Sequence, residues 1–354
     1  MKVAVLPGDG VGPEIVAQAV RVLMAVRPDI ECCQALVGAA AMRAGKAALP
    51  DETRALCDSS DAILFGSVGD AQLDGQPFER RPETALFSLR HDYKLFANLR
   101  PVRVYDGLEH ASSLHAHLIH GLDLIVVREL TGGIYFGVPK ERGVRQGVAW
   151  AVDTLSYTAP EVERIARVAF ELARSRRKRI TSVDKHNILQ TSRLWRDVVS
   201  EVACEYPDVQ VEHLLVDNAS MQLVRRPRDF DVIVTENMFG DILSDEAAIL
   251  CGSIGNLPSA SLSSDVSVRA FGMYEPIGGT APDIAGKGIA NPTGAILSAA
   301  MLLRYTAGDE ENAARIETAV AQAFRRGVRT PDLARDGDRP VTTAAFGDEV
   351  IAGL

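Results

Sequence analysis

Two carboxylates, Asp241 and Asp245, stand four residues apart in a segment that follows an apolar run at 231–235. If that segment is helical, the spacing places both side chains on one face, about one turn apart. Such a pair can hold a hard divalent cation such as Mg2+ or Mn2+, because these ions prefer oxygen ligands. A solvated acidic helix face is the alternative, and for an isolated pair of this kind it would be the better explanation.

Three arginines could bind an anionic substrate. Arg90 and Arg100 flank the segment His-Asp-Tyr-Lys-Leu-Phe-Ala-Asn-Leu, and Arg128 follows an apolar run at 122–127. A guanidinium binds a carboxylate through two parallel hydrogen bonds and keeps its proton at neutral pH, as a dicarboxylate site requires. For each arginine taken alone, a surface ion pair is the simpler explanation.

Several further segments join these groups in a recognisable combination. Together they resemble the isocitrate/isopropylmalate dehydrogenase family of metal-dependent β-decarboxylating dehydrogenases. The resemblance spans almost the whole chain and is carried by Val3-Ala-Val-Leu-Pro-Gly-Asp-Gly-Val-Gly-Pro-Glu14, 90–100, Arg128-Glu-Leu-Thr-Gly-Gly-Ile-Tyr135, Val183-Asp-Lys-His-Asn187, 231–245, 275–287 and Ile289-Ala-Asn-Pro292. It implies an α/β fold of the family's own type, not a Rossmann fold, with two α/β domains and a central cleft. Residues 1–99 and 252–354 would form a discontinuous nucleotide-binding domain, and residues 100–251 the substrate, metal and dimerisation domain.

The resemblance also implies the catalytic residues. Lys185 would take the proton of the C2 hydroxyl, directly or through water, and Tyr135 would protonate the enolate left after CO2 departs. Asp217 would join Asp241 and Asp245 as a metal ligand and would also contact the substrate. Lys185 and Asp217 are expected to come from the partner subunit of a homodimer. A half-buried tyrosine and a solvated lysine at the end of a strand are the structural alternatives.

The implied reaction is the NAD-dependent oxidative decarboxylation of (2R,3S)-3-isopropylmalate to 4-methyl-2-oxopentanoate and CO2 in leucine biosynthesis. Arg90, Arg100 and Arg128 would bind its carboxylates. Four further residues are predicted to contact the substrate, namely Glu83, Leu86, Phe87 and Ile188. Leu86 and Phe87 would form an apolar wall, which favours an isopropyl group over a third carboxylate, since an unpaired buried charge is costly.

Two departures from the family pattern leave the substrate's alkyl group open. Phe87 stands where leucine is usual, and His186 stands where alanine is usual in Asp-Lys-Ala-Asn. His186 is either a solvated residue at the end of a strand or a residue that reshapes the pocket. The same chemistry on another 3-alkylmalate or 2-hydroxy dicarboxylate is therefore the alternative. A non-catalytic regulatory paralogue is a third hypothesis, which the presence of the catalytic residues and arginines disfavours.

The cofactor is predicted from the loop at 275–291. By resemblance, it would bind NAD through Glu275, Gly278, Gly279, Thr280, Ala281, Asp283 and Asn291. Asp283 would face the adenosine ribose hydroxyls and would repel the 2′-phosphate of NADP. Many relatives have histidine in place of Gly278. An ordinary Gly/Pro turn explains the glycines, but not Asp283 together with Asn291.

The glycine-rich stretch near the N-terminus is not a dinucleotide-binding fingerprint. In Gly8-Asp-Gly10-Val-Gly12-Pro13 the third glycine falls one place early, and Pro13 occupies its expected position. Pro13 is better explained as a residue of the first helical turn, with Glu14 favourably placed against the helix dipole.

The elements that position these residues follow an α/β pattern, in which short apolar runs alternate with longer helical segments. Strands are expected at 2–6, 61–65, 122–127, 179–183 and 231–235, in a largely parallel sheet. Thr158 and Glu161 form a capping-box pattern that begins a helix over 160–175. Its buried face is expected to carry Val162, Ile165, Ala166, Ala169 and Leu172.

Composition excludes other classes of protein. The 354 residues are 47% apolar, which is enough for a sizeable core, and the net charge of −9 argues against a general affinity for nucleic acid or anionic membranes. Five cysteines without a C-x-x-C pair argue against a disulfide framework or a structural zinc site. No secretory signal and no apolar run of about 18 residues is found, so a cytoplasmic location is expected.

Overall fold

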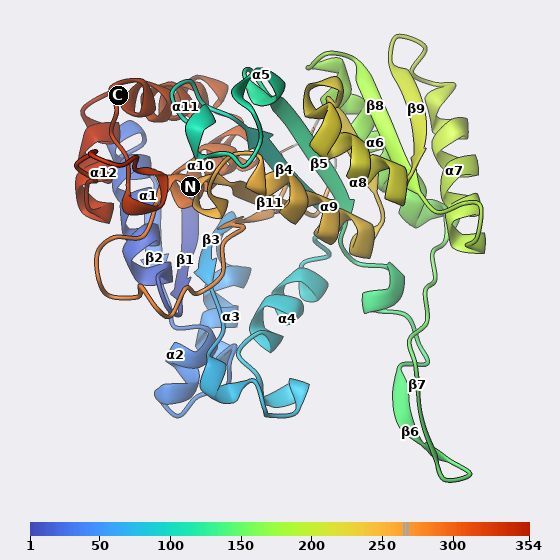
Figure 1. Cartoon of the computed structure of the whole chain (residues 1–354). Helices are drawn as coiled ribbons and strands as arrows, with labels where there is room; N and C mark the ends of the chain where they lie inside the picture. Colours follow the sequence, from blue (N-terminus) through green and yellow to red (C-terminus); the bar gives the residue numbers. More distant parts are fainter. Residues whose placement is uncertain (265, 267–268) are drawn as a thin grey trace.

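The computed structural model describes residues 1–264, 266 and 269–354 (Figure 1). Within them, ten strands form one sheet in the order β2-β1-β3-β12-β11-β4-β5-β10-β8-β9. The strands are β1 (Lys2–Gly8), β2 (Glu31–Gln34), β3 (Ala62–Ser67), β4 (Ala97–Arg103), β5 (Asp123–Glu129), β8 (Arg179–Asp184), β9 (Gln210–Leu215), β10 (Val232–Thr235), β11 (Pro258–Leu262) and β12 (Gly272–Pro276). All five expected strands are present, with shifts of one or two residues at their ends.

The sheet consists of two parallel groups joined through antiparallel pairs. Strands β2, β1, β3 and β12 run parallel to one another, as do β5, β10, β8 and β9. Between the groups, β11 pairs antiparallel with β12 and β4, and β4 pairs antiparallel with β5. The expectation of a largely parallel sheet is confirmed, but the antiparallel centre carries no simple sequence signal.

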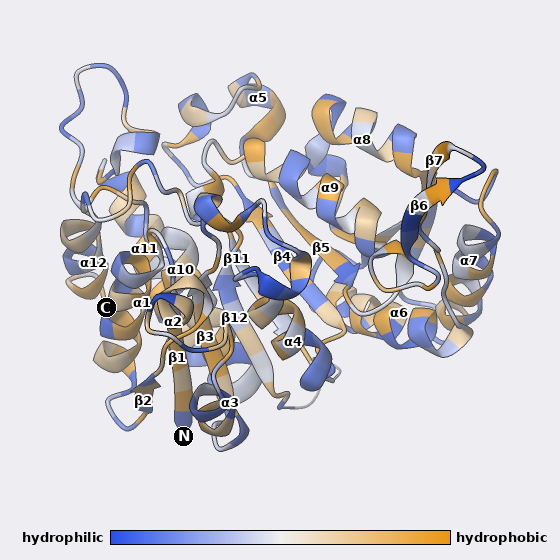
Figure 2. Cartoon of the chain, turned by 90° about the horizontal axis from the view of Figure 1, so that it is seen from below, coloured by the Kyte–Doolittle hydropathy of each residue, from blue (hydrophilic) through white to orange (hydrophobic). Residues whose placement is uncertain are grey.

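Helices cover both faces of the sheet. The longer ones are α1 (Gly12–Val26), α3 (Asp51–Asp58), α4 (Thr84–Asp92), α6 (Ala159–Arg174), α7 (Gln190–Ala203), α8 (Val216–Arg225), α9 (Asn237–Ile249), α10 (Thr293–Leu302), α11 (Glu310–Arg325) and α12 (Thr343–Ile351), and the shorter ones are α2 (Gly38–Arg43) and α5 (Ala116–Ile119). Figure 2 shows apolar and polar residues alternating along these helices, as expected for helices that pack one side on a sheet.

The two faces of the sheet differ in the continuity of their cores. On one face, α1, α10, α11 and α12 share a single hydrophobic core with α6 and α7. On the opposite face the core is split. One part packs α3 and α4 against β1 and β3, and the other packs α5, α8 and α9 against β4, β5 and β10. The split leaves room between α4 and α9, where polar side chains of the central strands can be reached.

Local sequence signals explain two of the helix starts. The side chain of Thr158 and that of Glu161 cap the start of α6 reciprocally, as predicted. All five residues expected on its inner face are buried. At α1, Pro13 lies in the first turn, and Glu14 is the acidic residue of that turn.

A two-stranded arm extends from the body of the molecule. Strands β6 (Glu141–Arg145) and β7 (Val148–Val152) form an antiparallel ribbon that projects away from the large sheet (Figure 1). Val144 and Val148 are 70% and 68% exposed, which is unusual for β-branched apolar residues.

In the part of the chain that is described, no helix is long and apolar enough to cross a membrane. The predicted boundary between residues 99 and 100 lies inside β4, and the boundary between 251 and 252 lies two residues after the end of α9. The division into domains stays a prediction.

Candidate active site

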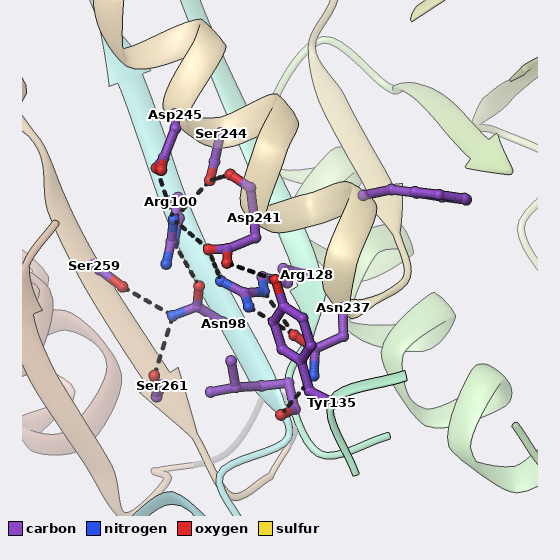
Figure 3. Close-up of polar contacts among 12 residues, drawn as sticks. Asn98, Arg100, Arg128, Tyr135, Asn237, Asp241, Ser244, Asp245, Ser259 and Ser261 are labelled. Atoms are coloured by element: carbon purple, nitrogen blue, oxygen red, sulfur yellow. Dashed lines mark hydrogen bonds and ion pairs between the residues drawn. The ribbon is translucent and has the colours of Figure 1, made fainter. Parts of the chain in front are cut away.

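The register of two central strands places two of the predicted arginines together. Asn98 on β4 lies opposite Arg128 on β5, and Arg100 follows two residues after Asn98. Because side chains two residues apart on a strand point to the same face, Arg100 and Arg128 lie diagonally on one face of the sheet. That face is the one with the split core, directly under α9 (Figure 3).

Arg128 is held by residues of α9. Its side chain is only 3% exposed, and its Nε and Nη2 donate to Oδ1 of Asn237 at 3.0 and 2.7 Å. Its Nη1 donates to Asp241. Gly240 permits this packing, because a Cβ there would lie 2.7 Å from Cγ of Arg128. Burial, reinforced by the charge of Arg100, lowers the pKa of Arg128 to about 10, so the guanidinium still carries its proton at neutral pH.

Arg100 is held in a similar way. Its Nε donates to Oδ1 of Asn98 at 2.8 Å, and its Nη1 donates to Ser244 at 2.7 Å and to Asp245 at 3.3 Å. The amide of Asn98 donates in turn to Ser259 and Ser261 on β11. Arg100 is therefore fixed between α9 and the neighbouring strand. Burial lowers its pKa.

Tyr135 lies beside the predicted metal ligand Asp241. It ends a short 3₁₀ turn, Gly133–Tyr135, and its hydroxyl donates to Oδ2 of Asp241 at 3.1 Å. The ring also lies near the Arg128 guanidinium, at 5.8 Å from its centroid. Burial and the negative charge of Asp241 raise the pKa of the Tyr135 phenol, which keeps it protonated and able to donate.

The third arginine reaches the site from α4, across the gap that separates α4 from α9. Arg90 on α4 is mostly buried and donates from Nη2 to Glu275 on β12 at 2.8 Å. Phe87, one turn earlier on α4, contacts Phe78 and Phe136 edge to face, with ring centroids 5.4 and 6.2 Å apart. Phe136 directly follows Tyr135, so the aromatic contact spans the two sides of the gap.

These groups line one cavity of about 260 Å³. Eleven predicted site residues lie on its wall: Glu83, Leu86, Phe87, Arg90, Arg100, Arg128, Tyr135, Asp241, Glu275, Gly278 and Gly279. The cavity combines three cations with an apolar side formed by Leu86, Phe87 and Phe136. This arrangement suits a small dicarboxylate that carries one apolar substituent.

The remaining residues of the predicted nucleotide loop continue away from the cavity. Thr280 is fixed by the N-terminal loop, since its carbonyl accepts from the backbone N–H of Val11 at 2.9 Å. Ala281 has a left-handed backbone, with φ of 39°, and Asp283 is exposed. The Asn291 amide donates to Asn256 and Asp332, and its Oδ1 accepts from the N–H of Thr293 at the start of α10. The backbone at Gly278 and Gly279 lies at the cavity wall, whereas Asp283 is exposed to solvent and accessible to a ligand.

Lys185, Asp217 and Ile188 do not line the cavity of the single chain. Lys185 donates to Oδ1 of Asp217 at 2.6 Å, and this hydrogen bond lowers the pKa of Asp217. The Asp217 side chain is 58% exposed, and Ile188 is 67% exposed. The pair thus sits together on an open surface, apart from Tyr135 and the arginines.

The donors of the predicted metal site are all carboxylates. Asp241 and Asp245 both approach Arg100, and Asp245 is 59% exposed. Oxygen donors fit Mg2+ or Mn2+. In the single chain, Asp217 does not lie close enough to Asp241 and Asp245 to share one ion with them. Among the described residues, the three groups that come close enough to share an ion are Asp106, Glu109 and His120, on a separate surface where Asp106 also pairs with Arg325.

Three buried polar residues of the site are additions to the predicted set. Asn98, Asn237 and Ser244 are fully buried, and each accepts from a site arginine. Asn98 was detectable in the sequence as a lone amide inside the apolar segment Leu-Phe-Ala-Asn-Leu. Asn237 and Ser244 belong to the same motif as Asp241, but their partners depend on how α9 packs on β4 and β5.

Known proteins resemble this chain both in sequence and in fold. The sequence profile of the family described as isocitrate/isopropylmalate dehydrogenase matches residues 2–350. A 3-isopropylmalate dehydrogenase from Bordetella avium (strain 197N) is 55% identical over 358 residues, which cover 100% of this chain and 99% of the relative. Among solved structures, an isocitrate dehydrogenase from Methylococcus capsulatus superposes with a TM-score of 0.88 at 36% identity, covering 99% of this chain and 98% of that one. A β-decarboxylating dehydrogenase from Thermococcus kodakarensis superposes with a TM-score of 0.79 at 37% identity, covering 99% and 95%.

Proposed function

Because this chain belongs to the isocitrate/isopropylmalate dehydrogenase family, we propose that it oxidises (2R,3S)-3-isopropylmalate with NAD+ and decarboxylates it to 4-methyl-2-oxopentanoate and CO2, in leucine biosynthesis. The observation that carries the proposal is the single cavity in which Arg90, Arg100 and Arg128 face the apolar side formed by Leu86 and Phe87. Full-length identity of 55% to a 3-isopropylmalate dehydrogenase supports the same substrate.

The arginines account for recognition of the substrate. Their guanidinium groups would bind the two carboxylates, and Leu86 and Phe87 would pack against the isopropyl group. Isocitrate carries a carboxymethyl group in place of that alkyl group, and so has a third carboxylate. On an apolar wall this charge would lie unpaired and partly desolvated, which costs several kcal/mol.

The chain's own groups would move the protons. Lys185 would remove the proton of the C2 hydroxyl. Tyr135, whose raised phenol pKa keeps its proton in place at neutral pH, would deliver that proton to the substrate carbon after CO2 leaves. Asp241, Asp245 and Asp217 would hold Mg2+ or Mn2+, which supplies electrophilic stabilisation of the developing negative charge, while NAD+ supplies the hydride acceptor.

The loop around Gly278 and Gly279 would hold the nicotinamide end of NAD, since both residues line the cavity. Glu275, Thr280, Ala281 and Asn291 belong to the same proposed nucleotide site, with Asp283 on its exposed part. We retain the division into a nucleotide domain of 1–99 with 252–354 and a substrate domain of 100–251 as part of the proposal.

A homodimer would complete the site. Lys185 and Asp217 lie outside the cavity of the single chain, and the proposal brings them to the cavity of a partner subunit. Exposed apolar residues offer a surface for this contact, namely Met221 and Val224 on α8 and Ile242 and Ile249 on α9. Exposed apolar side chains on two adjacent helices are typical of subunit interfaces.

One observation favours a second substrate. Phe87 fills more of the cavity wall than leucine would, and its edge contacts with Phe78 and Phe136 fix the ring. A 3-alkylmalate with a different substituent is therefore the alternative substrate for the same chemistry.

A substrate panel tests the proposal. Isopropylmalate, other 3-alkylmalates, isocitrate, homoisocitrate, malate and tartrate would each be supplied with NAD+ and Mg2+, and NADH formation would be followed at 340 nm. The proposal requires the highest kcat/KM with isopropylmalate. A preference for another alkylmalate supports the alternative, and absence of turnover with every compound refutes both.

A further inference from the structure

Asn237 connects two functional groups of the site (Figure 3). It begins α9 and is fully buried. Its Oδ1 accepts two hydrogen bonds from Arg128, at 3.0 and 2.7 Å. Its Nδ2 donates to the carbonyls of Leu130 and Gly132, at 3.1 and 3.0 Å. These carbonyls belong to the segment that leads directly into the turn of Tyr135.

The amide of Asn237 has no spare hydrogen-bonding capacity. An asparagine amide offers two lone pairs on oxygen and two N–H groups, and all four are used here. The backbone N–H of Asn237 is also paired, with the hydroxyl of Tyr157 at 3.0 Å. No other side chain of this size both accepts twice and donates twice in this geometry.

The segment that Asn237 holds is closely packed on its other sides. Glu129 accepts from the backbone N–H groups of Thr131 and Gly132, at 3.1 and 2.7 Å. Gly133 has φ of 77°, and a Cβ there would lie 2.5 Å from the Tyr157 hydroxyl. Glu129 thus fixes the N–H groups of the segment, Tyr157 limits its lateral position, and Asn237 fixes its carbonyls.

We propose that Asn237 is a positioning residue that holds Arg128 and the Tyr135 turn in one fixed relative geometry. The inference rests on the proposed function, in which Arg128 orients the substrate and Tyr135 donates the proton. A buried amide can do this because leaving either the guanidinium or the two carbonyls unpaired is costly.

Asn237→Asp separates the two contacts. The carboxylate still accepts from Arg128, but it presents an oxygen instead of an N–H to the carbonyls of Leu130 and Gly132. We expect kcat to fall about 10- to 100-fold, since a small displacement of a reacting group has an effect of this size. KM should change far less, because Arg128 keeps its acceptor. An unchanged kcat, or a loss confined to KM, overturns the proposal.

A double variant tests whether the effect passes through Tyr135. If it does, Asn237→Asp combined with Tyr135→Phe should be no slower than Tyr135→Phe alone. A general structural defect would instead give losses in kcat that multiply, and this result would overturn the proposal.

Asp231→Asn is the matched control. The side chain of Asp231 is 0% exposed and accepts from Nε of Arg176 at 2.8 Å. The residue directly precedes the strand that leads into α9. Replacing this aspartate by asparagine should lower the melting temperature without changing kcat.

Hydrogen exchange of the backbone amides of 131–135 should be faster in Asn237→Asp than in the wild type, and unchanged in Asp231→Asn. Because exchange needs no turnover, an inactive wild-type enzyme would refute only the proposed function, whereas equal exchange in all proteins would overturn the positioning role.

Discussion

Arg128 donates a hydrogen bond to Asp241 inside the cavity, so the arginine predicted to bind the substrate and the aspartate predicted to bind the metal are partners in this structure. A substrate carboxylate would bind the guanidinium of Arg128, and a divalent cation would bind the carboxylate oxygens of Asp241. When both bind, the substrate carboxylate replaces Asp241 as the partner of Arg128, and the cation replaces Arg128 as the partner of Asp241. Neither charged side chain is then left unpaired. The two ligands should therefore strengthen each other's binding, equally in both directions.

Metal removal is the first prediction. Exhaustive chelation should abolish oxidative decarboxylation, because Asp217, Asp241 and Asp245 cannot by themselves stabilise an enolate. NADH formation is measured before chelation, after it, and after addition of Mg2+ or Mn2+, which should restore activity. Calorimetry of Mn2+ binding with and without isopropylmalate measures the mutual strengthening independently of turnover. Full activity in the chelated enzyme would refute the metal assignment.

The second prediction concerns the guanidinium of Arg128. Arg128→Lys keeps the charge and one contact to the carboxylate but loses the second hydrogen bond of the pair, worth about 1.5–3 kcal/mol for charged groups, so kcat/KM should fall by about 10- to 100-fold. Arg103→Lys is the control, since Arg103 ends the adjacent strand β4, is exposed, and contacts the Tyr105 ring outside the cavity. Equal kinetics in the two variants would show that Arg128 does not bind the substrate.

Cofactor choice provides the third prediction. Asp283→Ala should narrow the preference for NAD+ over NADP+, because it removes both the ribose contact and the repulsion of a 2′-phosphate. The measurement is the ratio of kcat/KM for the two cofactors. Asp336→Ala removes the same charge from another exposed loop and should leave the ratio unchanged. If Asp283→Ala also leaves it unchanged, Asp283 does not select the cofactor.

Much of the fold was predictable because the signals are local. The apolar run at 231–235 and the i, i+4 carboxylates of Asp241 and Asp245 correctly predict a strand followed by a helix, and Thr158 with Glu161 predicts the start of α6. The antiparallel centre of the sheet was not predictable in this way. It depends on pairing between β4, β5 and β11, which are far apart in the sequence, and no short motif encodes that pairing.

The same distinction applies to the site. Residue type together with the family resemblance identified Arg90, Arg100, Arg128, Tyr135 and Asp241, and the structure brings all five to one cavity. The buried amides Asn98 and Asn237 were not singled out, because an asparagine acquires such a role only through its partners. Lys185 and Asp217 remain predictions of a shared site, because their proposed role depends on a contact between two chains.

The fourth prediction concerns substrate choice. Phe87→Leu should shift the preference among 3-alkylmalates according to bulk, at about 0.8 kcal/mol for each CH2 group buried or lost, while isocitrate stays poor. The measurement is kcat/KM across the alkyl series. Phe271→Leu removes the same bulk from a ring that stacks on Tyr93 and should leave the series unaltered. If the wild type uses isocitrate as well as isopropylmalate, or if Phe87→Leu leaves the series unchanged, Phe87 is not the specificity element.

Complementation between two inactive variants tests whether the site is shared. Lys185→Ala and Tyr135→Phe should each be nearly inactive as homodimers. In a heterodimer of the two, one site would combine the intact Tyr135 of one chain with the intact Lys185 of the other, and the second site would lack both. Co-expression in equal amounts should therefore restore about a quarter of wild-type activity, since half of the dimers are mixed and each has one intact site. If Lys185 instead serves the cavity of its own chain, every site in the mixture lacks one of the two residues. Activity no higher than the mean of the two variants would then exclude the shared site. As a control, Ile242→Glu, on the exposed apolar surface of α9, should separate the subunits and abolish the complementation.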